Sequence, residues 1–519
     1  MAGFELTNNQ KQAVQSRDKT LLVSAAAGAG KTAVLIRRIA SRILDDRDPI
    51  SVQDLLVVTF TKAAAAEVKD RLKKQLKESL LGCPGHKRLS KEIAHIEKAR
   101  ISTIHSFCQS VIKDCFQTLD ISPKIRVGDE TELLLLEKDC IERTLEEFYG
   151  ANTLPPEIQQ SFLDTVEVFS GSKTDAGLVE TLLDYYRYLL VYPYPFTYAK
   201  SIVTRLQEDI EGVKRQEKTF WETLPGKIFL EEFTSILSDC YSTSLWLEQE
   251  CLTHEVLSEK YYPAIHEDTS ALIQMLMKLR QNNYTGFIQS LLSYVPATLG
   301  QARKFENPRW LDHIKFLRTR NKDAIKELQS KYVYISSDII IRELERVAGI
   351  QKTMLLLLER YHELFREEKK KANLVDFSDL EHLALQALVK ENTFSYTDYS
   401  FEKTEYANQL TRELNEIYVD EYQDTNLLQD TILRAVSKEN NRFMVGDPKQ
   451  SIYAFRGAMP ALFRRYQKLF PRFEENASTP AYRIFLTDNF RSDSSIIDFT
   501  NGICSVMMNT DPCDPMYTA

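Results

Sequence analysis

The sequence lacks the features that mark exported, zinc-binding and membrane-spanning proteins. Its eight cysteines form no C-x-x-C pair and no cysteine–histidine cluster at zinc spacing. No apolar run approaches the roughly 18 residues that a membrane-spanning helix needs, and the first residues carry no basic and then apolar signal pattern. We therefore expect a cytoplasmic protein whose thiols are reduced and mostly packed.

An excess of positive charge is also missing. The formal net charge of −8 argues against a chain that is basic over its whole surface, but not against a local groove for nucleic acid. With 519 residues, 43% of them hydrophobic, the chain is long enough for more than one globular domain and a sizeable core.

The stretch SAAAGAGKT, residues 24–32, is the most informative feature that is present. It lies between residues 20–23, predicted as a strand, and an amphipathic helix predicted to begin near Thr32. This order is the context of a phosphate-binding loop, in which backbone N–H groups close around phosphate oxygens. Lys31 would place its ammonium at the β- and γ-phosphates, and Thr32 would offer its hydroxyl to Mg²⁺.

The loop departs from the G-x-x-x-x-G-K-T pattern at one place, where Ala25 replaces the first glycine. Gly28 and Gly30 remain, so the loop can still make its turns. A small-residue helix start that binds nothing is the alternative. We expect ATP to contact the whole loop, which consists of Ala25, Ala26, Ala27, Gly28, Ala29, Gly30, Lys31 and Thr32.

Further short apolar runs are predicted as strands of a parallel sheet, and they begin at residues 55, 101, 417, 443 and 484. One of them, 417–419, ends in Asp420 and Glu421. An aspartate at a strand end can hold Mg²⁺, directly or through water. An adjacent glutamate can take a proton from an attacking water molecule. The alternative is a pair of solvent-facing caps.

Residues 62–100 form a basic block near these motifs, with eleven Lys or Arg against five Asp or Glu. A charge-rich helix is usually a solvated face. Here, however, Phe60 lies between hydroxyl residues at a strand end beside the phosphate loop, which favours a single-strand stacking platform. Taken alone, His105 is more typical of a structural or surface histidine, and Gln10 of a capping box with Thr7.

Residues from about 120 to 365 are rich in Leu, Glu, Lys and Tyr with helical apolar spacing, and they predict a large all-helical insertion. The expected fold is therefore α/β, a RecA-like P-loop NTPase domain with a parallel sheet. We expect its first part at 1–120, the insertion at 121–365, its second part at 366–475, and the start of a second RecA-like domain at 476–519.

Several ordered stretches resemble the motifs of the UvrD/Rep group of superfamily 1 helicases. VDEYQDTN and VGDPKQSIYAFRGA resemble its second and third motifs, and LTDNFRS its fourth. LTNNQKQAV resembles its Q motif, and TFTKAAAAE and STIHSF its first DNA-contact motifs.

The resemblance implies roles for residues of the ATP site. Gln10 would read adenine, a role that now outweighs its capping role, and Phe490 would stack on the adenine ring. Gln450 would sense the γ-phosphate and couple it to DNA. Arg491 would reach across from the second motor domain and neutralise transition-state charge. Lys31, Thr32, Asp420 and Glu421 keep the roles argued above.

The resemblance also implies DNA contacts. Phe60, Tyr453 and Phe455 would stack on single-strand bases, and Thr61, His105 and Arg456 would touch the backbone. Ordinary core packing is the alternative for Tyr453 and Phe455.

The long insertion, and Ala33 where many simple members place an arginine, make the chain look like the AddA (RexA) subunits of bacterial ATP-dependent helicase–nucleases. This implies a 3′-to-5′ DNA motor in double-strand break repair by recombination, with an AddB/RexB-type partner. RecB-type and plain UvrD-type helicases are near alternatives. Because the sequence ends at Ala519, we expect the later helicase motifs and the nuclease domain to be missing.

Two other functions stay open. The chain would bind ATP and single-stranded DNA with little turnover if half of a composite site were absent. A metabolic kinase with the same phosphate loop is far less favoured, because it leaves VGDPKQSIYAFRGA without a role.

Overall fold

The structure, a computed structural model, describes residues 6–82, 87–150, 155–171, 174–302, 305–332, 337–474 and 479–507. The chain divides into two compact units. The first, here called the sheet unit, comprises the described residues within 1–154, 166–199 and 354–500. The second, the helical unit, comprises those within 155–165, 200–353 and 501–519.

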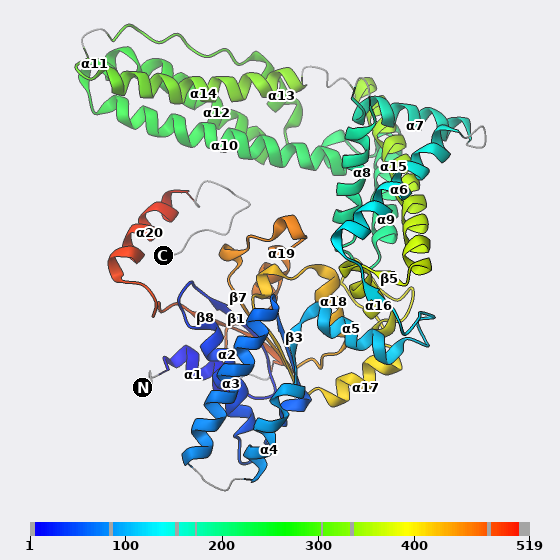
Figure 1. The fold of residues 1–519 in the computed structure, drawn as a ribbon. Coiled ribbons are helices and arrows are strands. Elements are labelled where there is room, and N and C mark those ends of the chain that lie inside the picture. The colour runs from blue at the N-terminus through cyan, green and yellow to red at the C-terminus, as the bar shows by residue number, and fades with distance from the viewer. Residues whose placement is uncertain are drawn as a thin grey trace. The chain divides into compact units, whose positions relative to one another are not determined.

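The sheet unit is built on six parallel strands in the order β3-β2-β6-β7-β1-β8 (Figure 1). Their bounds are β1 Thr20–Ala25, β2 Leu55–Thr59, β3 Arg100–Thr103, β6 Glu416–Val419, β7 Arg442–Gly446 and β8 Ala481–Leu486. Parallel pairing puts all six carboxyl ends at one edge of the sheet, where open α/β folds bind ligands. The predicted α/β fold with a parallel sheet is confirmed.

β8 differs in its place from our expectation. We expected residues from 476 onward to begin a second RecA-like domain, but β8 pairs with β1 from Ala481 to Leu486. Its alternating buried residues pack into the same core as β1 and β7, and this burial accounts for the pairing. The strand therefore completes the first sheet.

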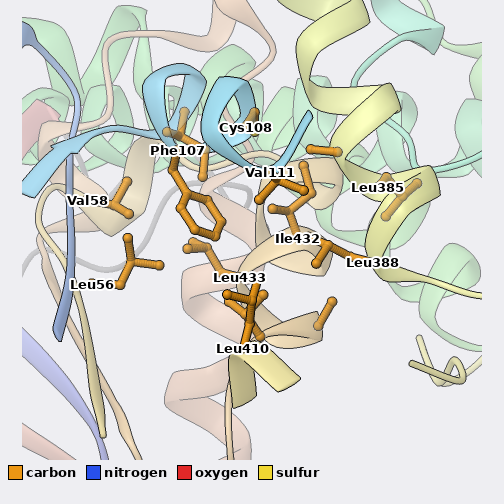
Figure 2. Packing of buried hydrophobic residues seen from close by; sticks show 14 of the residues in the cluster. Leu56, Val58, Phe107, Cys108, Val111, Leu385, Leu388, Leu410, Ile432 and Leu433 are labelled. Carbon is orange, nitrogen blue, oxygen red and sulfur yellow. The ribbon is translucent and has the colours of Figure 1, made fainter. Parts of the chain in front are cut away.

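Helices cover both faces of this sheet, as the two-sided apolar strands predict. On one face Leu21, Leu55 and Phe443 share a core with helices α2 and α3. On the other, Leu56 and Val58 pack against α5, α16 and α18, which Figure 2 shows at close range. The helices around the sheet are α1 Asn8–Gln15, α2 Lys31–Ile43, α3 Lys62–Gly82, α4 Lys87–His95, α5 Ile104–Cys115, α16 Phe377–Leu388, α17 Glu405–Glu413, α18 Leu427–Ala435, α19 Pro460–Leu469 and α20 Ser494–Met507.

The segment between α5 and α16 is helical apart from a short parallel pair, β4 (Arg126–Val127) with β5 (Leu374–Val375). Its helices are α6 Glu130–Tyr149, α7 Pro156–Phe169, α8 Ala176–Leu189, α9 Pro195–Lys214, α10 Leu224–Leu252, α11 Glu255–Lys260, α12 Tyr262–Arg280, α13 Tyr284–Ser293, α14 Pro308–Tyr332 and α15 Ser337–Lys371. Helices α10 to α14 lie in the helical unit, whereas α6 and α8 lie in the sheet unit.

The helical unit has its own apolar cores. Phe233, Leu272 and Phe287 are fully buried in one of them, between α10, α12 and α13. Cys240 and Cys251 are buried free thiols, as are three cysteines of the sheet unit, in line with the packed thiols that we predicted. None of the helices within the described ranges is long and apolar enough to cross a membrane.

A buried ion cluster joins α2 to β6 in the sheet unit. Arg38 Nε lies 3.2 Å from one carboxylate oxygen of Glu416, and Arg42 Nε lies 2.7 Å from the other. All three side chains are at most 6% exposed. Two buried guanidinium groups therefore depend on one carboxylate.

Replacing this carboxylate should destabilise the sheet unit. We expect Glu416→Ala to lower the free energy of unfolding by roughly 3–5 kcal/mol, because it leaves buried charges uncompensated. The matched control is Glu413→Ala, which breaks an exposed ion pair with Arg100 and should cost ~1 kcal/mol or less. Thermal unfolding monitored by circular dichroism compares the two variants, and equal losses would contradict the expectation.

Candidate functional site

The phosphate-loop stretch folds as the sequence predicts, between the end of β1 and the start of α2. Gly28 and Gly30 have φ of 75° and 80°, a left-handed conformation that favours glycine. Ala25 is still the last residue of β1 and pairs with Leu486. This extended position does not need a glycine, which explains why the loop tolerates its one departure from the pattern.

A lysine–carboxylate contact lies at the centre of the site. Lys31 Nζ donates to Glu421 Oε2 at 2.9 Å and to Gln450 Oε1 at 3.4 Å. Three predicted site residues, far apart in the chain, thus meet at the carboxyl edge of the sheet. Glu421 has φ of 52°, an uncommon conformation for a non-glycine residue, just after the end of β6.

Two residues without an assigned role in our sequence analysis hold this cluster together. Gln423 donates to Glu421 Oε2 at 2.8 Å and accepts from the backbone N–H of Asp447 at 2.9 Å. Asp447 in turn accepts from Gln450 Nε2 at 2.7 Å. Their only signal in the sequence is that they lie next to strand ends, within stretches already recognised as motifs.

Asp420 is partly buried beside Glu421 and donates its backbone N–H to Val58. Burial, together with the nearby negative charge of Glu421, raises the pKa of the Asp420 carboxyl to about 6. Removing a proton from this group therefore costs free energy in the nucleotide-free chain, and a bound cation would offset that cost.

The adenine-side candidates contact the loop from outside. Gln10 forms the predicted capping box with Thr7, and its Nε2 also donates to Ala29 O at 3.1 Å. The backbone N–H of Phe490 donates to Gly28 O at 3.0 Å, and its ring is 41% exposed. The side chain of Arg491 is also exposed. The structure thus brings Gln10 and the backbone of Phe490 to the loop.

Asn489 is a loop contact that our sequence reasoning missed. It donates to Ala27 O at 3.0 Å, and a Cβ added at Gly28 would lie 2.6 Å from its Oδ1. Glycine is therefore required at position 28 both by its φ and by this close approach.

These residues fit Mg²⁺ bound with a nucleotide better than a metal bound by protein alone. No group of three or more His, Cys, Asp or Glu that could hold a metal was found among the described residues. Mg²⁺ is usually held by one or two carboxylates together with phosphate oxygens and water. Thr32 in the first turn of α2 and Asp420 at the end of β6 are the available protein oxygens.

The predicted DNA-contact residues gather in a second group. The rings of Phe60 and Tyr453 lie 4.3 Å apart with an interplanar angle of 32°. Arg456 lies over the rings of Tyr453 and Phe455, and Phe455 is 78% exposed. Thr61 is exposed and caps α3 by accepting from Ala64. Exposure makes core packing the weaker interpretation of Phe455.

A cavity of about 540 Å³ connects the two groups. Its lining includes Phe60, His105 and Arg456 from the predicted DNA contacts, and Asp420 and Glu421 from the nucleotide site. The cavity is also lined by residues that our sequence analysis did not single out, among them Arg187, Phe377 and Glu381.

Fold and site together define a P-loop protein with a nucleotide-binding edge beside an aromatic and basic surface. The sequence model of the family described as "UvrD/REP helicase N-terminal domain" matches residues 6–471, and the chain belongs to this family. The resemblance drawn from the motifs is thus confirmed. Membership in a helicase family implies the use of ATP.

Curated relatives are named as one of the subunits of an ATP-dependent helicase/nuclease. The chain is 34% identical over 99% of its length to the protein of Thermoanaerobacter pseudethanolicus, and covers 40% of that relative. It is 32% identical to the protein of Oceanobacillus iheyensis over 97% of the chain, covering 39% of the relative. For Clostridium acetobutylicum the values are 31%, 97% and 40%. The chain thus spans about two fifths of the length of these relatives.

The raised pKa of Asp420 predicts a trade between stability and function. We expect Asp420→Asn to raise the free energy of unfolding of the nucleotide-free chain by roughly 2 kcal/mol at pH 7 to 8. The ionised carboxylate is unfavourable in the folded state above pH 6, so the gain should shrink as the pH falls from 6 towards 4, where both states are protonated.

Chemical denaturation at several pH values measures this effect. Asp45→Asn is the control, because the hydrogen bonds that its carboxylate accepts lower the pKa of Asp45. A stabilisation by Asp420→Asn that does not depend on pH would count against the explanation.

Proposed function

We propose that this chain is the ATP-driven motor portion of a DNA helicase subunit that moves 3′ to 5′ on single-stranded DNA. We further propose that it acts in the cytoplasm in double-strand break repair by recombination, with an AddB/RexB-type partner. The names of the relatives support the helicase–nuclease setting. The observation that carries the proposal is the meeting of Lys31, Glu421 and Gln450 beside the Phe60–Tyr453 pair.

The residues of the nucleotide site divide the chemistry among them. Bound Mg–ATP would supply the phosphoanhydride bond whose hydrolysis drives the motor. The loop from Ala25 to Thr32 binds phosphate through backbone N–H groups and the Lys31 ammonium, helped by the N-terminus of α2. Thr32 and Asp420 would hold Mg²⁺.

Glu421 orients the attacking water and accepts its proton, a role that requires it to exchange its contact with Lys31 when phosphate takes the ammonium. Gln10 and Phe490 would contact adenine, and Arg491 would neutralise transition-state charge.

Gln450 is suited to link ATP to DNA. It contacts Lys31 on one side and Asp447 on the other, within the 3₁₀ turn η5 (Pro448–Gln450). Tyr453, which contacts Phe60, follows three residues later. A shift of the Gln450 amide on phosphate binding would therefore reach the stacking pair through a short, hydrogen-bonded segment.

A second candidate is an ATP- and DNA-binding fragment without turnover. The exposed side chain of Arg491 favours it, since an arginine that acts in catalysis must reach the phosphates. A stand-alone UvrD-like helicase remains a further alternative, because the site residues do not depend on a nuclease partner.

The proposed function predicts DNA-stimulated ATP hydrolysis that depends on Lys31. In a phosphate-release assay, single-stranded DNA should raise turnover by this chain, and Lys31→Ala should abolish it and weaken ATP binding by at least ~10-fold. ATP and DNA binding without turnover would favour the second candidate. If ATP binding is unaffected by Lys31→Ala, the assignment of the phosphate loop fails.

The stacking surface makes a separate prediction. Phe60→Ala and Tyr453→Ala should each weaken binding of a labelled oligothymidylate by about 1–3 kcal/mol, or roughly 5- to 150-fold. Tyr149→Ala, which removes a half-exposed aromatic ring from α6, is the control and should bind DNA as the wild type does. Fluorescence anisotropy measures the three affinities. Unchanged binding by both site variants would remove the proposed platform.

A further inference from the structure

We infer that Glu381 is a positioning residue for DNA binding, which fixes the imidazole of His105 and ties it to helix α18 beside the nucleotide site. The inference rests on the proposed function, because it takes His105 as a DNA contact. Glu381 lies on α16, and His105 lies in the first turn of α5.

One carboxylate oxygen makes both contacts. Oε1 of Glu381 lies 3.1 Å from His105 Nε2 and accepts a hydrogen bond from Gln429 Nε2 at 2.8 Å. His105 also has the ring of Phe377 on another side, with centroids 4.9 Å apart. The imidazole is thus held between two residues of α16, and all three line the cavity described above.

The burial of Glu381 argues that its role is not packing. The residue is only 5% exposed, and its neighbours on α16, Leu380, Ala384 and Leu385, belong to the apolar core. A buried carboxylate is costly unless polar partners offset the lost hydration, so an apolar side chain would serve the core better. The partners that it does have are a predicted DNA contact and a residue of the helix after Asp420 and Glu421.

The contact with Gln429 connects His105 to the nucleotide side. Gln429 forms a capping box with Asn426 at the start of α18. Asn426 ends the stretch VDEYQDTN, which also contains Asp420 and Glu421. Glu381 therefore fixes His105 relative to the segment that carries the catalytic carboxylates, through two hydrogen-bonded side chains.

A double-mutant cycle tests whether Glu381 acts through His105. The variants are Glu381→Gln, which keeps the size of the side chain but removes its charge, His105→Ala, and the two combined. The control is Glu92→Gln, since Glu92 is equally buried but accepts from Ser51 and Val52, outside the cavity. The readouts are the Kd for a labelled oligothymidylate and the Kd for a fluorescent ATP analogue with Mg²⁺.

We expect Glu381→Gln to raise the Kd for the oligothymidylate about fivefold, the size expected for one lost charge-assisted hydrogen bond. In the His105→Ala background the same change should have no effect, because the group that it positions is absent. The Kd for the ATP analogue should not rise with it, and Glu92→Gln should change neither constant.

Three results would overturn the inference. These are an equal loss of DNA affinity with and without His105, no loss at all, and a parallel loss of nucleotide affinity, which would indicate a structural role. If the wild-type chain binds no oligothymidylate, the proposed function fails first, and this outcome is distinguishable because the wild type itself is silent.

Discussion

The contact between Lys31 and Glu421 is the interaction on which the rest of the site depends. The two residues are 390 positions apart, and they meet at 2.9 Å because β1 and β6 run parallel on either side of β7. A parallel sheet brings strand ends together however long the intervening chain is. The whole segment from α6 to α15 can therefore lie between them in sequence without disturbing the site.

The contact also sets the electrostatics of the nucleotide-free chain. Lys31 balances the charge of Glu421, whereas the Asp420 carboxyl carries a raised pKa because it is buried next to that glutamate. A cation or a phosphate would change this balance, since each competes for one side of the contact. Gln423 and Asp447 keep the surrounding amides in place, so that a change at Lys31 is passed to Gln450 in particular.

The sequence predicts well what local chemistry determines. The phosphate loop, the strand that precedes it and the acidic end of β6 were all recognisable, because each depends on consecutive residues. Gln423, Asn489 and Glu381 were not, since their roles arise from contacts with residues distant in sequence. The place of β8 was missed for a similar reason: an isolated apolar run does not indicate which sheet it will join, and only its pairing with β1 decides this.

The central claim of this account is that the nucleotide site and the stacking surface are coupled through Gln450. The most direct test is the Kd of the wild-type chain for a labelled oligothymidylate, with and without a non-hydrolysable ATP analogue and Mg²⁺. The account predicts that the analogue changes this Kd, that the oligothymidylate changes the affinity for the analogue by the same factor, and that Gln450→Ala removes both effects. A Kd for DNA that is the same with and without the analogue would contradict it.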